Sequence, residues 1–253
     1  MQEIRVTELI SALKQVRWST TASTSSLLTE LHIRHGFTGT PVAELAHLNP
    51  PHHCRQVHGT EIVATSALTL PSIESAARIA ADGLYSVDGQ RIAVKTADCL
   101  PVLMAATQSP FTQAVHAGWR GLTDGILFNA VKIARDHQPL NQCRFVIGPA
   151  ISREAFEVGP ELVDALKSET CGLLPNTWML PLSKGKTDRW HVDLSLAATL
   201  QLLISGVEPE HIEVIHACTV LDTKDGKFLW NSFRRQGKGC DSNWSWIQNG
   251  TKV

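Results

Sequence analysis

The segment that decides the fold class reads Gln-Ala-Val-His-Ala-Gly-Trp-Arg-Gly at residues 113–121 and continues into residues 122–136. Its first four residues form an apolar segment of strand length that ends in His116. The segment that follows places apolar side chains on one helical face, at Ile126, Ala130, Ile133 and Ala134. A buried strand that leads directly into an amphipathic helix is typical of an α/β or α+β domain.

Working outward, apolar segments of strand length recur on both sides of this unit. They cover residues 61–65, 91–95, 102–106, 144–147 and 213–216. Helical patterns alternate with them at 7–17, 160–169 and 194–205. Trp244 and Trp246 are two residues apart, which predicts a strand whose tryptophan face closes the core. Residues 19–26 and 38–53 are rich in loop-forming residues, and no repeat or second composition regime appears, so the pattern predicts one domain.

The composition is that of an ordinary globular protein. The 253 residues are 43% hydrophobic and 19% charged, which excludes a disordered chain, collagen or a coiled coil. Lys and Arg number 23 against 24 Asp and Glu, and this near-neutral balance argues against nucleic acid as the main partner.

The six cysteines and the apolar runs predict a cellular compartment. The cysteines are far apart with no C-x-x-C pair, which is neither a disulfide scaffold nor a structural zinc finger. The N-terminus lacks the pattern of a secretory signal, and the longest apolar run, Leu100–Ala106, is far short of a membrane span. We therefore expect a reduced, soluble, cytoplasmic protein that does not bind membranes.

His116 lies at the end of a predicted strand, beside the start of a predicted helix. Backbone N–H groups at a helix N-terminus favour anions, and the neighbouring Arg120 offers a two-pronged donor for phosphate or carboxylate. The plain alternative is a tight turn with a core histidine and a surface arginine.

Two other segments carry reactive side chains. Cys99 lies at the junction of two apolar strands, and His58 lies in Gln-Val-His-Gly just before a strand. If folding brings His58, Cys99 and His116 to one sheet edge, they provide three ligands for zinc and leave the fourth position open. Cys99 and His116 could instead form a thiolate–imidazolium nucleophile. A buried, inert thiol is the plain alternative, and spacing alone does not choose.

The remaining candidates are weaker. Arg234 and Arg235 follow an apolar segment and form either an exposed basic turn or an anion clamp. His52 and His53 lie in a Pro-rich loop and are predicted to be solvated. His191 and His216 either support a site or belong to the core, and the other cysteines are predicted to be structural: Cys54, Cys143, Cys171 and Cys240.

Nine short motifs occur in the order found in one known family. They are Gln-Val-His-Gly (56–59), Ala-Asp-Gly-Leu (81–84), Thr-Ala-Asp-Cys-Leu-Pro (96–101), His-Ala-Gly-Trp-Arg-Gly (116–121), Ile-Gly-Pro (147–149), Phe-Glu-Val-Gly (156–159), Asp-Leu (193–194), Cys-Thr (218–219) and Ser-Phe-Arg-Arg (232–235). Over residues 33–240 the chain resembles the laccase-like multicopper polyphenol oxidoreductases. Members of that family are also called purine nucleoside phosphorylases, and one is called a peptidoglycan editing factor.

The resemblance implies a fold and a site. The fold is a single α/β (α+β) domain of mixed β-sheets flanked by helices, similar to toxin-type Cys/His deamidases. We expect one such domain over 1–253, with 1–30 as a divergent N-terminal extension. The implied catalytic and zinc-binding residues are His58, Cys99 and His116.

The implied activity is phosphorolysis of adenosine, inosine and methylthioadenosine to a base and ribose-1-phosphate, together with deamination of adenosine. The partners are then a purine nucleoside and phosphate, and Arg120, Arg234 and Arg235 are candidates for holding the phosphate because of their charge and position. The family name also admits copper, but the chain has no His-x-His pair, which makes polyphenol oxidase chemistry a weaker hypothesis.

Two further hypotheses stay open. One is a metal-free hydrolase that cleaves an amide in a cell-wall precursor, with Cys99 as nucleophile and His116 as base. The other is a catalytically weakened binding protein, because residues 38–57 form a shorter segment than is usual in the family.

Overall fold

The computed structural model describes residues 6–19, 23–39, 51–67, 79–167 and 182–250. One large sheet contains β1 (Arg17–Ser19), β3 (Ile62–Ala64), β4 (Gly83–Ser86), β6 (Leu100–Ala106), β7 (Thr112–Ala117), β8 (Cys143–Ile147) and β12 (Ile212–Ile215). These seven strands follow the order β1-β12-β8-β6-β7-β4-β3. The pairs β1-β12, β12-β8 and β3-β4 are parallel, and the other pairs are antiparallel. The predicted mixed sheet is therefore present.

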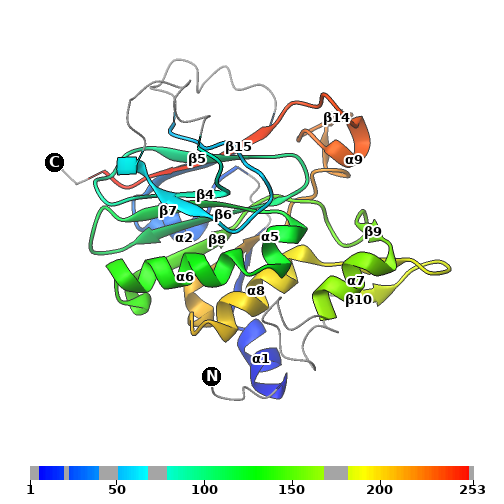
Figure 1. Cartoon of the computed structure of the whole chain (residues 1–253), viewed down its shortest axis with the longest axis horizontal. Helices are drawn as coiled ribbons and strands as arrows, with labels where there is room; N and C mark the ends of the chain where they lie inside the picture. The colour runs from blue at the N-terminus through cyan, green and yellow to red at the C-terminus, as the bar shows by residue number, and fades with distance from the viewer. Residues whose placement is uncertain (1–5, 20–22, 40–50, 68–78, 168–181, 251–253) are drawn as a thin grey trace.

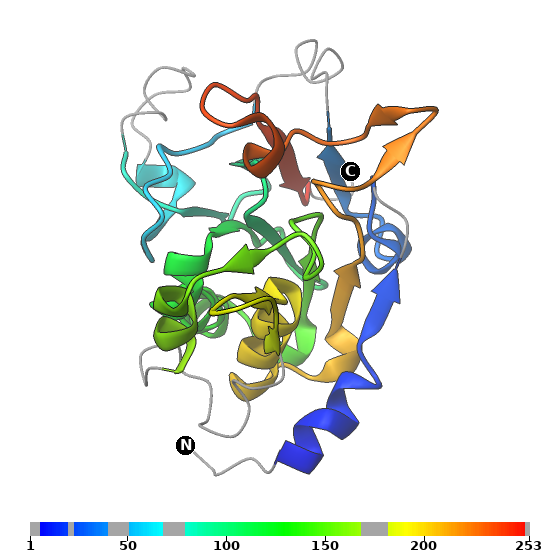
Figure 2. The same ribbon diagram turned by 90° about the vertical axis from the view of Figure 1, so that its right-hand side faces the viewer.

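Three smaller sheets accompany this central sheet. An antiparallel sheet has the order β2 (Arg34–Thr38), β15 (Asn243–Gln248) and β5 (Ile92–Thr96). A second consists of β10 (Leu182–Lys184), β11 (Trp190–Val192) and β9 (Glu157–Val158). The third is a hairpin of β13 (Thr223–Lys224) and β14 (Lys227–Phe228), which projects from the body of the molecule in Figure 2.

Among the described residues, five helices pack on one face of the central sheet: α1 (Val6–Leu13), α5 (Trp119–Thr123), α6 (Ile126–His137), α7 (Pro160–Lys167) and α8 (Leu194–Ile204). The short helix α2 (Ser26–Glu30) packs on the other side, against β2, and α9 (Phe233–Gln236) follows the β13–β14 hairpin. Single 3₁₀ turns lie at Thr65–Ala67, Leu140–Gln142 and Pro209–His211. Figure 1 shows α6 and α8 on one side of the central sheet and β5 and β15 on the other. The molecule is therefore layered as small sheet, central sheet and helices.

The two spaces between these layers hold two apolar clusters, and strand β6 serves both. Val102 and Met104 belong to the cluster on the helix side, whereas Leu103 and Ala105 belong to the cluster between the sheets. All residues of β6 are buried, which explains its unbroken apolar sequence. β6 pairs with β7 on one side and with β8 on the other, so its register sets the positions of the residues at the ends of these strands.

The six strands predicted from apolar segments are all present, with boundaries within two residues. The predicted helices at 160–169 and 194–205 correspond to α7 and α8, with residues 168 and 169 outside the described ranges. The pattern at 122–136 is not one helix, because Gly125 adopts φ +93° and separates α5 from α6. A left-handed residue ends a helix, and glycine adopts that conformation at little cost.

Two burial predictions are wrong. Residues Asn243, Ser245 and Ile247 of β15 face the core, so Trp244 and Trp246 lie on the outer face, where Lys95 and Arg91 cover their rings. Asn243 faces inward because its side-chain amide pairs with the backbone of Asn231.

His53 is 4% exposed and contacts Trp244 edge-on, so it is not solvated, whereas His52 is half-buried. Residues 51–53 place the His53 ring against the outer tryptophan face instead of leaving it in solvent.

The first 30 residues contain structural elements of the layered body. β1 forms the edge of the central sheet through its pairing with β12. The buried carboxylate of Glu213 on β12 accepts hydrogen bonds from Ser25 Oγ and from the backbone N–H of Leu27, at the start of α2. Predicted helix 7–17 is shorter and ends at Leu13. Among the described residues, no helix has the length and hydrophobicity to cross a membrane.

Candidate functional site

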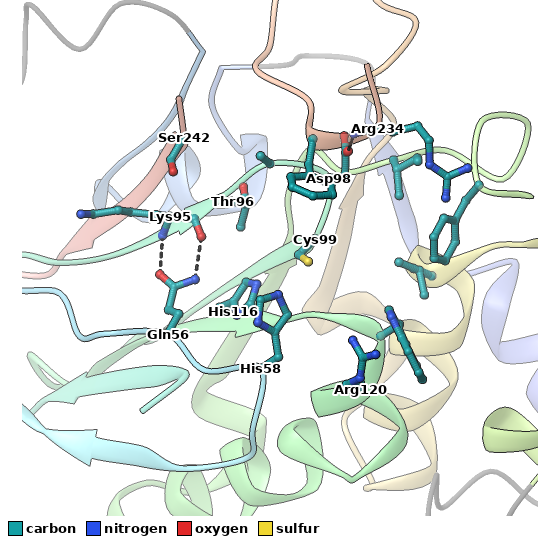
Figure 3. Close-up of a pocket in the computed structure, with 16 residues that line it drawn as sticks. Gln56, His58, Lys95, Thr96, Asp98, Cys99, His116, Arg120, Arg234 and Ser242 are labelled. Carbon is teal, nitrogen blue, oxygen red and sulfur yellow. Dashed lines mark hydrogen bonds between the residues drawn. The ribbon is translucent and has the colours of Figure 1, made fainter. Parts of the chain in front are cut away.

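His58, Cys99 and His116 meet at one end of the central sheet. His58 lies in the loop before β3, Cys99 lies directly before β6, and His116 is the penultimate residue of β7. The register pairs Pro101 with His116 across β6 and β7, which brings Cys99 to the same end. The ligand atoms of the three side chains all lie within 4.8 Å of one another (Figure 3). The convergence predicted from chemistry is therefore observed in the structure.

Asp82 organises two of these three residues. Its fully buried carboxylate accepts a hydrogen bond from His116 Nδ1 at 2.8 Å. It also accepts the backbone N–H groups of Val57, His58 and Gly59, at 2.7 to 3.2 Å. Because Nδ1 of His116 is engaged, its Nε2 is left to face the cluster. This is the arrangement by which a carboxylate orients a histidine that binds a metal.

The backbone around His58 is shaped for this contact. His58 has φ +62°, a left-handed conformation that costs free energy for a residue other than glycine. That conformation turns three successive N–H groups toward Asp82 and forms an anion-binding nest. The carboxylate thus offsets the backbone strain and holds the exposed His58 in place.

Two glycines, Gly118 and Gly121, allow the segment before and within α5 to lie close to His58, Gly59 and Cys99. A Cβ atom at Gly118 would lie 2.9 Å from His58 Cδ2 and 3.3 Å from Cys99 Sγ. A Cβ atom at Gly121 would lie 2.6 Å from the carbonyl oxygen of Gly59. The Gly-Trp-Arg-Gly segment therefore brings α5 against the three reactive side chains, which larger residues would push apart.

The cluster is electrostatically coupled. Burial alone would raise the pKa of the Cys99 thiol, but hydrogen bonds with His116 and His58 outweigh it and lower this pKa to about 7. Burial likewise opposes the charged form of His116, but Asp82 and Cys99 raise its pKa to about 9. Burial also opposes the Asp82 carboxylate, whose pKa nevertheless falls because His116 and the backbone N–H groups stabilise it. The site therefore favours a thiolate, the form that binds metals and acts as a nucleophile.

A cavity of about 430 Å³ opens onto the cluster. Its lining includes Trp119, Arg120, Ile151, Phe156, Leu194, Phe233 and Arg234. In Figure 3, Arg120 and Arg234 lie on one side of the cluster, and Gln56 and Lys95 lie on the other. This volume falls within the range of small-molecule sites, about 300 to 1,000 Å³.

The two cavity arginines are both stacked on aromatic rings. The guanidinium carbon of Arg120 lies 4.2 Å from the ring centroid of Trp119, and that of Arg234 lies 5.5 Å from the ring centroid of Phe156. Arg234 Nη1 also donates to the carbonyl oxygen of Glu157 at 3.2 Å. Stacking restricts each side chain, so both cations are preorganised beside the cluster.

Comparison with known proteins identifies the family. A family model described as multi-copper polyphenol oxidoreductase laccase matches residues 40–248. The chain belongs to this family. The match extends over β3 to β15 and therefore includes the whole cluster, its carboxylate and the cavity.

Several relatives in the family carry enzyme names. The chain is 34% identical over 195 residues to a protein named purine nucleoside phosphorylase from Xylella fastidiosa (strain 9a5c), covering 77% of this chain and 72% of that protein. It is 30% identical over 172 residues to a protein named adenosine deaminase RL5, from an unknown prokaryotic organism, covering 65% and 63% respectively. The crystal structure of YlmD from Geobacillus stearothermophilus superposes with a TM-score of 0.71 at 29% identity, covering 83% of this chain and 77% of that one. The family resemblance and the mixed α+β fold are therefore confirmed.

The three arginines predicted to bind phosphate differ in their position relative to the cavity. Arg120 and Arg234 line the cavity, but Arg235 does not. The Arg235 guanidinium donates to the carbonyl oxygens of Thr219, Val220 and Trp230 and stacks on Phe228. Arg235 thus connects segments of the backbone, and its donors are engaged away from the cavity.

Some residues that shape the site were not predicted to do so. Asp82 was visible only as part of the motif Ala-Asp-Gly-Leu, a carboxylate set among small residues. Asp98 adopts φ +90°, and its carboxylate accepts Thr219 Oγ1 and the backbone N–H of Arg234, both at 2.6 Å. It thereby ties the Cys99 loop to α9. Gln56 bonds both backbone groups of Lys95.

Two further candidate histidines, His191 and His216, are not part of the cluster. His191 Nδ1 donates to the carbonyl oxygen of Arg153, and His216 lines a separate cavity of about 290 Å³ with Cys218. Cys54 and Cys143 are buried free thiols and Cys240 is partly exposed, whereas Cys171 lies outside the described residues.

The donor set fits a metal ion. Two imidazoles and one thiolate are ligands that zinc accepts in a catalytic site with an open fourth position. The space that Gly118 leaves beside all three side chains, and the Asp82 contact to His116 Nδ1, are the features expected around such a centre. Among the residues that the structure describes, this is the one group of three or more such ligands.

Proposed function

We propose that this protein is a zinc-dependent purine nucleoside phosphorylase that also deaminates adenosine. The observation that carries the proposal is the His58–Cys99–His116 cluster, which opens into a cavity with two stacked arginines on one side. The enzyme names of relatives aligned over most of this chain support it.

His58, Cys99 and His116 would hold the zinc ion. When bound, zinc supplies Lewis acidity, which activates water and polarises a substrate group near neutral pH. Copper is the weaker assignment, because the described residues provide one three-ligand group and laccase chemistry needs several copper centres. Asp82 accepts a hydrogen bond from His116 Nδ1, so it would keep Nε2 of His116 directed at the zinc ion.

In phosphorolysis, a phosphate oxygen forms a bond to C1′ of the ribose while the C1′–N9 bond breaks. The bonding electron pair leaves with the purine, so negative charge must be stabilised on both the phosphate and the base. Arg120 and Arg234 provide two fixed cations on one side of the cavity for this purpose. In deamination, the 6-amino group of adenosine leaves as ammonia and water supplies the oxygen of inosine.

The decisive experiment combines metal analysis with product analysis. Purified protein is expected to contain one zinc ion per chain. Incubation of adenosine with phosphate should give adenine and ribose-1-phosphate by phosphorolysis and inosine by deamination, as separated by chromatography. Loss of both reactions in His58→Ala is expected, and full turnover in that variant would contradict the three-ligand site.

The phosphate site has its own test. Removing a charged hydrogen-bond donor costs about 1.5 to 3 kcal/mol, so Arg120→Ala should raise KM for phosphate at least about tenfold. Arg153→Ala is the matched control, because Arg153 lines the second cavity and not the first. Equal KM values for phosphate in both variants would contradict the assignment.

The competing hypotheses predict other results. Amide hydrolysis by Cys99 would persist after chelation of the metal and would stop after alkylation of this thiol. A binding protein would retain zinc and bind nucleosides without turnover. Either outcome replaces the proposed function.

A further inference from the structure

The ring of Phe233 is exposed at the edge of the cavity. It is 54% exposed and lines the same cavity as the metal-binding cluster. An exposed phenyl ring loses the stabilisation that burial would provide, about 1.5 to 3 kcal/mol for a side chain of this size. Such a ring beside a site of polar and charged residues is a feature of ligand contact surfaces.

The backbone that carries Phe233 is firmly held. Asp98 accepts the backbone N–H of Arg234, and Ser232 Oγ accepts that of Arg235. The Arg235 guanidinium connects α9 to three carbonyl oxygens of neighbouring segments. The exposure of Phe233 therefore does not arise from a loose segment, because α9 presents the ring from a fixed position.

The other aromatic rings of the cavity already carry a partner. Arg120 stacks on Trp119 and Arg234 stacks on Phe156. Among the described residues, no cation or aromatic ring is paired with Phe233. Its ring is thus available to a planar ligand, next to the two cations.

We propose that Phe233 is the stacking platform for the planar base of the substrate. The identity of that base as a purine rests on the proposed function. A phenyl ring offers no hydrogen-bond donor or acceptor, so it selects for planarity and not for the substituents of the ring. Phe233 therefore gives the enzyme tolerance among purine bases, while the metal-binding cluster and the arginines act on the reacting bonds.

The test measures equilibrium binding of inosine in phosphate-free buffer, by calorimetry on the zinc-loaded protein. Neither reaction can proceed there, because inosine has no 6-amino group and phosphate is absent. Loss of base stacking on an aromatic side chain costs about 1 to 3 kcal/mol, so Phe233→Ala should weaken binding about 5- to 150-fold. Phe233→Trp should retain binding, and Phe233→Leu should lose most of it.

Phe228 provides the matched control within the same segment. It is 50% exposed, but Arg235 covers its ring and it does not line the cavity. Phe228→Ala should bind inosine like the unmodified protein. The affinities for both inosine and guanosine should fall in Phe233→Ala, whereas loss of affinity for only one of them would show that Phe233 does not act by stacking.

The outcomes separate this inference from the proposed function. Unchanged inosine binding in Phe233→Ala, or no binding of inosine to the unmodified protein, would overturn the inference. Weakened binding in a protein that does not turn over inosine with phosphate would support the inference and overturn the proposed function. If Phe233→Ala catalyses phosphorolysis of inosine with an unchanged KM, the proposed function is supported and the inference about Phe233 is overturned.

Discussion

A thiol and an imidazole occur in two regions of this molecule with opposite chemistry. In the core between the two sheets, Cys54 Sγ donates to the carbonyl oxygen of Ala81, and burial raises its pKa to about 12. His35 is fixed there by backbone groups, and burial lowers its pKa. In the cluster, the pKa of Cys99 is lowered and that of His116 is raised. Burial opposes the charged form of the thiol and of the imidazole in both regions, so the partner of each group decides its chemistry.

The comparison is tested most strongly by removing each thiol. Cys99→Ala deletes a proposed metal ligand and should lower kcat/KM for the proposed adenosine phosphorolysis by at least about a thousandfold, because such clusters act as a unit. Cys54→Ala removes a thiol paired only with a carbonyl oxygen and should leave kcat/KM within about threefold. A large loss of kcat/KM in Cys54→Ala, in protein shown to be folded by circular dichroism, would contradict the distinction between the two regions.

Thiol reactivity gives the next largest contrast. After chelation of the metal, iodoacetamide at neutral pH should alkylate Cys99 about 10² to 10³ times faster than Cys54. The lower thiol pKa favours the thiolate, although a lower pKa also reduces its intrinsic nucleophilicity. Peptide mass spectrometry over a time course measures both rates, and equal rates would contradict the comparison.

Asp82 links the two regions, because it bonds to His116 and raises the pKa of Cys54 by its charge. Asp82→Asn should weaken zinc binding about 10- to 100-fold, the usual cost of losing a partner behind a ligand. Competition with a chromogenic chelator measures the dissociation constant. Asp88→Asn is the control, since the exposed Asp88 bonds to Ser86 and Gln90 and not to the cluster. Equal affinities in the two variants would exclude the orienting role.

The smallest effect concerns His35 and stability. Its folded pKa lies below the ordinary value of 6.5, so the unfolded chain binds more protons as the pH falls below 6.5. The free energy of unfolding should therefore fall by up to about 1 kcal/mol between pH 6.5 and 5.5 because of this residue. Urea unfolding at both pH values measures it. His35→Gln should be less stable at pH 7.5 but less sensitive to pH, and an equally steep pH dependence would contradict the assignment.

The sequence predicted most of the layered frame. Apolar segments such as 102–106 and 144–147 are long and unbroken, so local pattern was sufficient to identify β6 and β8. Strands β2 and β4 were missed because Arg34–Thr38 and Gly83–Ser86 contain polar residues and glycines, whose burial depends on strands distant in the chain. The inward face of β15 was misassigned for the same reason, since Asn243 is buried only through its contact with Asn231.

In the candidate site, too, the sequence identified some features and only the structure showed the others. Residue types identified His58, Cys99 and His116 because few other side chains have their chemistry. Charge identified Arg120, Arg234 and Arg235 equally well, but only the structure shows that Arg235 is bonded to backbone carbonyl oxygens. The part played by Asp82 was hidden because its partners come from two separate segments.

The amino-acid sequence alone therefore determined where the long apolar strands form, which family motifs are present and which side chains can react. Only tertiary structure decided which reactive groups share a partner and which cations face the cavity. The reason is physical: strand and helix patterns depend on neighbours a few residues away, whereas the state of a thiol, an imidazole or a guanidinium depends on atoms a few ångströms away from anywhere in the chain.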